Sequence, residues 1–159
     1  MDAERYQGKM TDKKRVLFLC VGNSCRSQMA EGFLRAIASC KYDVYSAGTV
    51  ASGLSPNAVK VMSELGIDIS GQRSKRVDEF AGQRFDYVVT VCDNSEHNPC
   101  PVFIGQSGEQ FHWPFDDPAY ATGDEEDVLE IFRRIRNRIT ERIECFVKEE
   151  AIIVLLGPE

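Results

Sequence analysis

A continuous apolar run near the amino end of the chain places the strongest constraint on the fold. Residues 16–21, VLFLCV, have no polar break, which is typical of a strand buried on both faces. A short loop containing Gly22 and Asn23 follows, and Met29 and Phe33 then recur at helical spacing. Strands of this kind belong to parallel sheets covered by helices, so this unit predicts an α/β fold.

The same alternation recurs along the chain. Further strands are predicted at Val44–Ala47, Phe85–Cys92 and, more weakly, Phe111–Trp113. Ser55 and Pro56 start one helix, and an apolar stripe predicts a last helix over roughly residues 125–149. We therefore predict a three-layer, flavodoxin-like α/β fold with a four-stranded parallel sheet flanked by helices.

At 159 residues the chain has the size of one domain. Residues 1–13 are polar and are interpreted as a flexible leader, residues 14–149 as the single folded domain, and residues 150–159 as a C-terminal tail. The apolar part of this tail could add an edge strand, dock on the domain or mediate self-association, and the sequence leaves these alternatives open.

Charge and hydrophobicity exclude several classes of partner. The chain has 25 acidic and 19 basic residues and a net charge of -6, which argues against general binding to nucleic acid or to anionic membranes. Its longest aliphatic run, residues 151–156, is too short to span a bilayer, and its amino end is charged where a signal peptide would be apolar. We expect a cytoplasmic monomer whose cysteines are thiols rather than a disulfide framework.

The segment 20–27, CVGNSCRS, is the strongest candidate site because it lies between a buried strand and a helix. Gly22 should let the backbone adopt conformations closed to other residues, so that successive amides form an anion cradle at the positive end of the helix. Arg26 can hold two oxygens of a tetrahedral oxyanion. Together with Ser27, these groups should favour the thiolate of Cys20, the predicted nucleophile. The expected oxyanion-binding residues are Val21, Gly22, Asn23, Ser24, Cys25 and Arg26.

Two further features complete the candidate site. Asp117, fixed by Pro118, is the preferred acid for a departing oxygen and Asp116 the reserve, although Asp-Asp-Pro is also a common turn. Cys92 ends a predicted strand and could face Cys20 across one crevice. Cys25, Cys40 and Cys145 are interpreted as structural thiols.

Four segments resemble the low-molecular-weight phosphatase superfamily, and within it most closely the thioredoxin-coupled arsenate reductases. They are CVGNSCRSQMAEGF from Cys20, SAG from Ser46, TVCDN from Thr90 and HWPFDDP from His112, and the similarity spans about residues 16–146. The resemblance implies the phosphatase fold, with residues 14–149 as a catalytic domain that reduces arsenate to arsenite. Alternatives are a protein tyrosine phosphatase that hydrolyses phosphate monoesters, and a non-catalytic redox or oxyanion sensor.

A phosphatase of this superfamily needs only Cys20, whereas arsenate reduction also needs two electrons from thiols that end as a disulfide. The resemblance implies that Cys92 attacks Cys20, that Cys100 then attacks Cys92, and that an external reductant, thioredoxin, restores the thiols. Disulfide geometry requires Cys100 to approach Cys92 by rearrangement of residues 93–99. No bound organic cofactor is expected, and Cys92, His97 and Cys100 would make an incomplete zinc site.

Some relatives hold a potassium ion near the residues that match Asn23, Glu31 and Ser46, with the help of an aspartate. This chain has Lys75 at the position of that aspartate. We expect the ammonium group of Lys75 to replace the ion.

Overall fold

The computed structural model describes residues 12–93 and 99–156. Its strands and helices are β1 (Lys14–Cys20), α2 (Arg26–Ala38), β2 (Tyr42–Gly48), α3 (Pro56–Ser63), β3 (Arg84–Thr90), β4 (Gln106–His112) and α4 (Glu125–Leu156). Short 3-10 helices lie at Val77–Phe80 and Pro118–Tyr120. The strands form one four-stranded parallel sheet in the order β2-β1-β3-β4, which confirms the predicted fold class.

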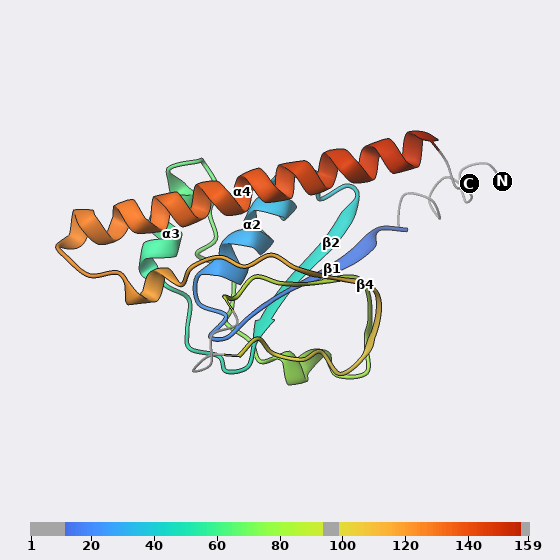
Figure 1. Ribbon diagram of the computed structural model, residues 1–159, viewed down its shortest axis with the longest axis horizontal. Helices are drawn as coiled ribbons and strands as arrows, with labels where there is room; N and C mark the ends of the chain where they lie inside the picture. The colour runs from blue at the N-terminus through green and yellow to red at the C-terminus, as the bar shows by residue number, and fades with distance from the viewer. Residues whose placement is uncertain (1–11, 94–98, 157–159) are drawn as a thin grey trace.

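The two faces of the sheet are covered differently. Helices α2, α3 and α4 lie over one face, where Val16 and Phe18 of β1 join the larger hydrophobic core (Figure 1). Leu17 and Leu19 point to the other face, where they pack with Phe80 of the first 3-10 helix and other apolar residues. Because β1 is buried on both sides, its sequence has no polar alternation.

The structure corrects two predicted boundaries. β4 starts at Gln106, whereas the sequence predicts a strand only over residues 111–113. β4 is an edge strand whose residues are mostly exposed, so its first part lacks an apolar pattern. α4 continues to Leu156, so residues 150–156 extend this helix and add no edge strand to the sheet.

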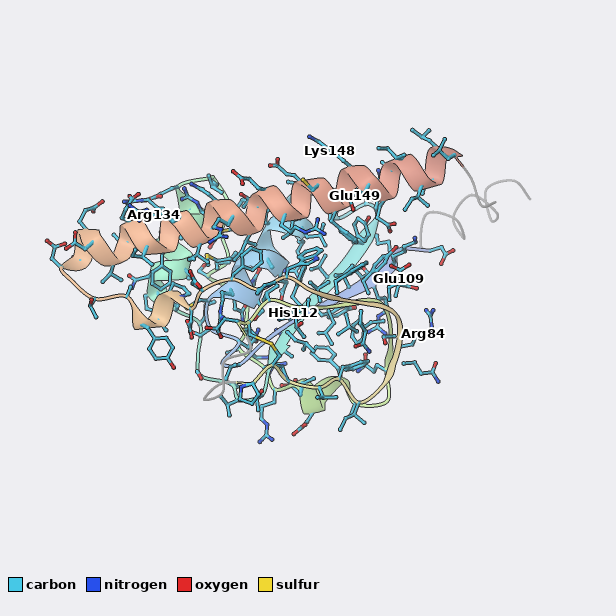
Figure 2. The ribbon with its side chains drawn as sticks, viewed as in Figure 1. Arg84, Glu109, His112, Arg134, Lys148 and Glu149 are labelled. Atoms are coloured by element: carbon cyan, nitrogen blue, oxygen red, sulfur yellow. A yellow bond between two sulfur atoms is a disulfide. The ribbon has the colours of Figure 1, made fainter. Side chains whose placement is uncertain are left out.

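Helix α4 is tied to the sheet near its carboxyl end. Lys14 of β1 donates a hydrogen bond of 3.3 Å to Glu150, and the Tyr87 hydroxyl of β3 donates to the same carboxylate. Lys148 projects from the outer side of the helix, away from the sheet (Figure 2). Within the described ranges, no helix has the length and hydrophobicity required to cross a membrane.

Candidate active site

Cys20 ends β1 beside a cavity of ≈ 220 Å³ at the carboxyl ends of the strands. Residues of the loop after β1 line this cavity together with Cys20, Arg26, Ser52, Asp117 and Tyr120. Cys20 is only 2% exposed. The cavity is therefore a small recess above a nearly buried sulfur.

Hydrogen bonds behind the loop set its backbone direction. The carbonyl oxygens of Val21, Gly22 and Ser24 accept hydrogen bonds of 3.0, 2.9 and 3.1 Å from the amides of residues 50, 52 and 55. These hydrogen bonds anchor the loop from one side, and a curled loop held in this way can present backbone amides to an anion. The amino end of α2, which begins at Arg26, adds its positive dipole.

The reason predicted for Gly22 is wrong. The loop residue in the left-handed region is Asn23, with φ 48°, a conformation that asparagine tolerates better than most residues. Gly22 has no positive φ; instead, a Cβ there would lie 2.9 Å from Ser52 Oγ. A side chain at position 22 would therefore require Ser52 to shift.

A buried chain of hydrogen bonds runs from Glu31 to the sulfur of Cys20. Ser46 donates to Glu31 at 2.6 Å, and the side-chain amide of Asn23 donates to both Ser46 and Ser27, at 2.9 and 2.8 Å. Ser27 Oγ lies 2.8 Å from Cys20 Sγ. The sulfur is thus the end point of a polar network whose members are all buried.

Two residues of the loop between β4 and the second 3-10 helix hold Arg26 at the cavity. Its Nη1 donates to the carbonyl oxygen of Phe115 at 2.9 Å, and its Nη2 lies 3.3 Å from Asp117 Oδ2. A weaker ion pair of 4.0 Å joins Arg26 to Asp93. Asp117 lines the cavity and also caps the short helix that starts at Pro118, whereas Asp116 is exposed.

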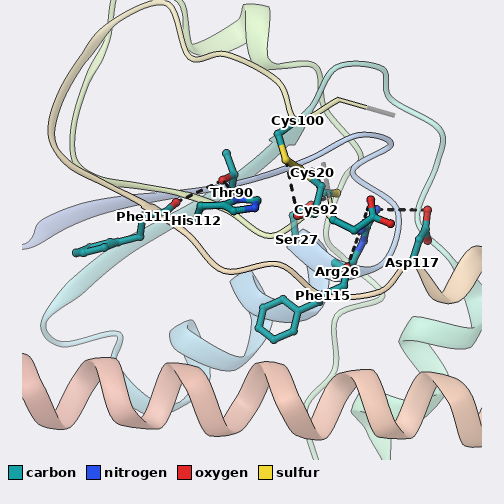
Figure 3. The surroundings of a disulfide bond; sticks show 11 residues. Cys20, Arg26, Ser27, Thr90, Cys92, Cys100, Phe111, His112, Phe115 and Asp117 are labelled. Atoms are coloured by element: carbon teal, nitrogen blue, oxygen red, sulfur yellow. Dashed lines mark hydrogen bonds and ion pairs between the residues drawn. A yellow bond between two sulfur atoms is a disulfide. The ribbon is translucent and has the colours of Figure 1, made fainter. Parts of the chain in front are cut away.

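Cys92 and Cys100 form a disulfide with a Cα–Cα distance of 5.9 Å. The amide of Val91 donates to the carbonyl of Leu19 at 2.8 Å, which brings Cys92 alongside the end of β1. Figure 3 shows the disulfide with Cys20, Arg26, Ser27 and Asp117 around it. Cys92 is fully buried while Cys100 is partly exposed, so Cys100 is the more accessible residue of the pair.

Lys75 lies on the far side of the polar network. Its ammonium nitrogen is 3.7 Å from Glu31 Oε1 and donates to the Arg73 carbonyl at 2.7 Å. Burial lowers the pKa of Lys75, and the Glu31 carboxylate opposes that shift. Because this ammonium faces Glu31, the residues present do not fit a potassium ion bound at the same carboxylate.

The other predicted thiol positions have mixed outcomes. Cys25 is buried, as predicted, and burial raises its pKa. Cys40 and Cys145 are exposed, so their interpretation as structural thiols is wrong. Residues 94–98, which include His97 of the zinc alternative and most of the segment 93–99, lie outside the described residues.

Sequence reasoning also missed the backbone amides of residues 50, 52 and 55, which hold the loop from behind. They carry no motif, because any residue except proline supplies a backbone amide.

Comparisons with known proteins agree with this geometry. The family described as low molecular weight phosphotyrosine protein phosphatase matches residues 15–152. An arsenate reductase of Halalkalibacterium halodurans is 48% identical over 137 residues, covering 86% of this chain and 97% of the relative. Among solved structures, an arsenate reductase in the phosphate binding state has a TM-score of 0.71 at 35% identity and covers 86% of this chain and 98% of its own. The thioredoxin-dependent arsenate reductase of Corynebacterium glutamicum has a TM-score of 0.58 at 28% identity, with 90% of this chain and 67% of that chain covered.

Proposed function

The chain belongs to the low molecular weight phosphotyrosine protein phosphatase family, and from this premise we propose that it is an arsenate reductase, which converts arsenate to arsenite. The observation that carries the proposal is the Cys92–Cys100 disulfide beside the cavity of Cys20. Hydrolysis of a phosphate ester requires a nucleophile, an anion site and an acid. Reduction also requires a pair of thiols that give up two electrons, and this chain has such a pair at the site.

In the first step, the loop amides and Arg26 hold the arsenate oxygens, and the Cys20 thiolate attacks arsenic. Asp117 delivers a proton to a hydroxyl of arsenate, which leaves as water. A sulfur–arsenic bond forms and an arsenic–oxygen bond breaks, so the oxidation state of arsenic does not change. Asp117 Oδ2 lies 3.3 Å from Arg26 Nη2, so the proposed acid is within reach of an anion held by Arg26, which supports these roles.

In the second step, Cys92 attacks the sulfur of Cys20. The sulfur–arsenic bond breaks, its electron pair stays on arsenic, and arsenite leaves from a Cys20–Cys92 disulfide. Cys100 then attacks Cys92, and Cys20 departs as a thiolate. A free Cys20 with Cys92 bonded to Cys100 is the state expected at the end of this sequence.

Recycling requires an external dithiol, for which we propose thioredoxin, by analogy with the thioredoxin-dependent relative. Its thiolate would attack the partly exposed Cys100, and Cys92 would leave as a thiolate that takes up a proton. The thiols supply both electrons, so the reaction needs no bound organic cofactor. This dependence on reduced thiols agrees with a cytoplasmic location.

Replacing Cys92 and Cys100 separately by serine tests the proposal, with Cys40→Ser as the matched control at an exposed cysteine. We expect arsenate turnover to fall at least about 100-fold in both relay variants, whereas hydrolysis of p-nitrophenyl phosphate stays within about twofold of the parent chain. Cys100→Ser should release one equivalent of arsenite and retain a Cys20–Cys92 disulfide, visible by mass spectrometry. Unchanged arsenate turnover in both variants would refute the relay.

The same assay separates an enzyme from a stoichiometric sensor. With thioredoxin, thioredoxin reductase and NADPH in excess, the parent chain should form arsenite continuously. Arsenite formation that stops after one equivalent per protein would identify a sensor.

A further inference from the structure

The segment that follows Cys100 presents apolar side chains to solvent. Val102 is 79% exposed and Ile104 is 76% exposed. Residues 99–108 contain no charged side chain, although 28% of the chain is charged. Depletion of charge together with exposed apolar side chains distinguishes the centre of a protein interface from ordinary surface.

The packing of Phe103 determines the direction in which Val102 and Ile104 point. Phe103 lies between them and points inward, with its ring centroid 5.5 Å from that of Phe85. Because successive side chains of an extended segment point to opposite sides, the inward Phe103 directs Val102 and Ile104 outward. The carbonyl of Ile104 accepts a hydrogen bond of 3.0 Å from Gly82, and the disulfide fixes the other end of the segment at Cys100.

We propose that Pro101, Val102 and Ile104 form a docking surface for the dithiol protein that reduces the Cys92–Cys100 disulfide. This inference rests on the proposed function and extends it to the partner's binding site. The surface starts one residue after Cys100, the more accessible residue of the disulfide, so a partner seated on it would bring its own thiol to the disulfide. The partner should carry an uncharged, apolar rim around its reactive cysteine.

The size of the surface suits a transient redox encounter. Weak redox complexes bury less than about 1,200 Å² in total, and a few apolar side chains beside the reacting atoms can supply their contact. Charged side chains such as Arg84 and Glu109 project elsewhere, from β3 and β4 (Figure 2), whereas residues 99–108 have none. An acidic residue introduced at the surface should therefore weaken docking without affecting the sulfurs.

The test replaces Val102 and Ile104 by aspartate, with Val154→Asp as the matched control, since Val154 is 71% exposed at the end of α4. Arsenite formation is measured with thioredoxin, thioredoxin reductase and NADPH, and separately with dithiothreitol. We expect the KM for thioredoxin to rise about tenfold in each variant, while turnover with dithiothreitol stays within about twofold. Val154→Asp should change neither the KM for thioredoxin nor the turnover with dithiothreitol. Thermal unfolding checks that each variant is folded.

An unchanged KM for thioredoxin in both variants would overturn the inference. An equal loss of turnover with thioredoxin and with dithiothreitol would also overturn it, because the substitution would then affect the disulfide itself. A dimer of the parent chain that dissociates in the variants, seen by sedimentation, would assign the surface to a second copy and also overturn it. The proposed function fails by a different result: no arsenite from the reduced parent chain in a single turnover without any reductant.

Discussion

Ser27 Oγ lies 2.8 Å from Cys20 Sγ, close enough for its hydroxyl to donate to the sulfur once Cys20 is a thiolate. The side-chain oxygen of Asn23 accepts from the Lys75 amide and from Gln28, so its NH₂ group faces Ser27 and donates to it at 2.8 Å. Because the Ser27 oxygen already accepts this hydrogen bond, its own O–H is available to donate to sulfur. A hydrogen bond to the charged form of a group stabilises that form, so this serine should stabilise the Cys20 thiolate.

Ser27→Ala should therefore slow the reaction of Cys20. A hydrogen bond to a charged group contributes about 1.5–3 kcal/mol, which corresponds to a rate lower by roughly 10- to 100-fold. The measurement is the single-turnover rate of arsenite release at neutral pH, together with alkylation of Cys20 by iodoacetamide. Ser63→Ala on α3, an exposed serine bonded to Lys60, is the control. An unchanged rate of alkylation in Ser27→Ala would show that the hydroxyl does not activate the thiol.

Asp117→Asn should separate proton transfer from anion binding. Asparagine keeps the acceptor for the amide of Ala119 but loses the negative charge beside Arg26. Formation of the arsenic adduct should slow at least about 100-fold, the usual contribution of a general acid. Phosphate affinity, measured by calorimetry, should stay equal or increase, since a negative charge near the anion is removed.

Asp116→Asn is the matched control for this acid, because Asp116 is exposed and adjacent in sequence. If Asp116→Asn slows adduct formation and Asp117→Asn does not, the acid is Asp116.

Gly48→Ala should distort the anion loop. Gly48 pairs with Cys20 in the sheet, and a Cβ there would meet the Val21 carbonyl at 2.6 Å and the Asn23 amide at 2.8 Å. Both contacts are with backbone atoms, which cannot rotate away, so we expect a loss of about 1–3 kcal/mol in the free energy of unfolding. The affinity for phosphate should fall as well, because the distorted loop is the anion site.

Gly71→Ala is the control for this substitution, because nothing lies within 4 Å of its added Cβ. Its free energy of unfolding should stay within about 0.5 kcal/mol of the parent value. Equal phosphate affinity in Gly48→Ala and the parent chain would mean that the loop accommodates the methyl group.

The sequence predicts best where burial determines the residue type. The run 16–21 predicts β1 because a strand covered on both faces must be apolar throughout, and Ser55 predicts the start of α3 because its hydroxyl caps the helix. Edge strand β4 is exposed, so residues 106–110 give no such signal. The end of α4 is missed because residues 151–156 fit an apolar strand as well as a helix.

At the site, the sequence indicates which side chains belong together but not how the backbone shapes the loop. The pattern of Cys20 and Arg26 between a strand and a helix brings both residues to one cavity. The left-handed residue, however, is Asn23 rather than Gly22, and a Cβ at Gly22 would instead approach Ser52 Oγ at 2.9 Å. Such approaches depend on segments distant in sequence, which local pattern does not contain.

Cys25 should be the thiol that is slowest to react, although it lies beside the anion site. Burial raises the pKa of Cys25 above its ordinary value of 9.0, so its thiolate should be scarce below that pH and increase only at higher pH. Iodoacetamide at pH 7 to 8.5 should therefore label the exposed Cys40 and Cys145 but leave Cys25 free, as read by peptide mass spectrometry. Labelling in guanidinium chloride is the control for intrinsic reactivity. Alkylation of Cys25 at pH 7 as fast as that of Cys40 would contradict the prediction.

Lys75→Asp should make the stability of the protein depend on potassium. Glu31 is nearly buried and faces the Lys75 ammonium at 3.7 Å, and Arg35 pairs with its other oxygen at 2.8 Å. An aspartate at position 75 would remove one positive charge and add a negative charge next to Glu31, with an expected loss of about 2–4 kcal/mol in the free energy of unfolding in sodium buffer. Potassium should restore part of this loss by binding between the two carboxylates, whereas the parent chain and the neutral variant Lys75→Met should unfold at the same temperature in either salt. A potassium-dependent rise in the unfolding temperature of the parent chain would show that the ammonium does not replace the ion.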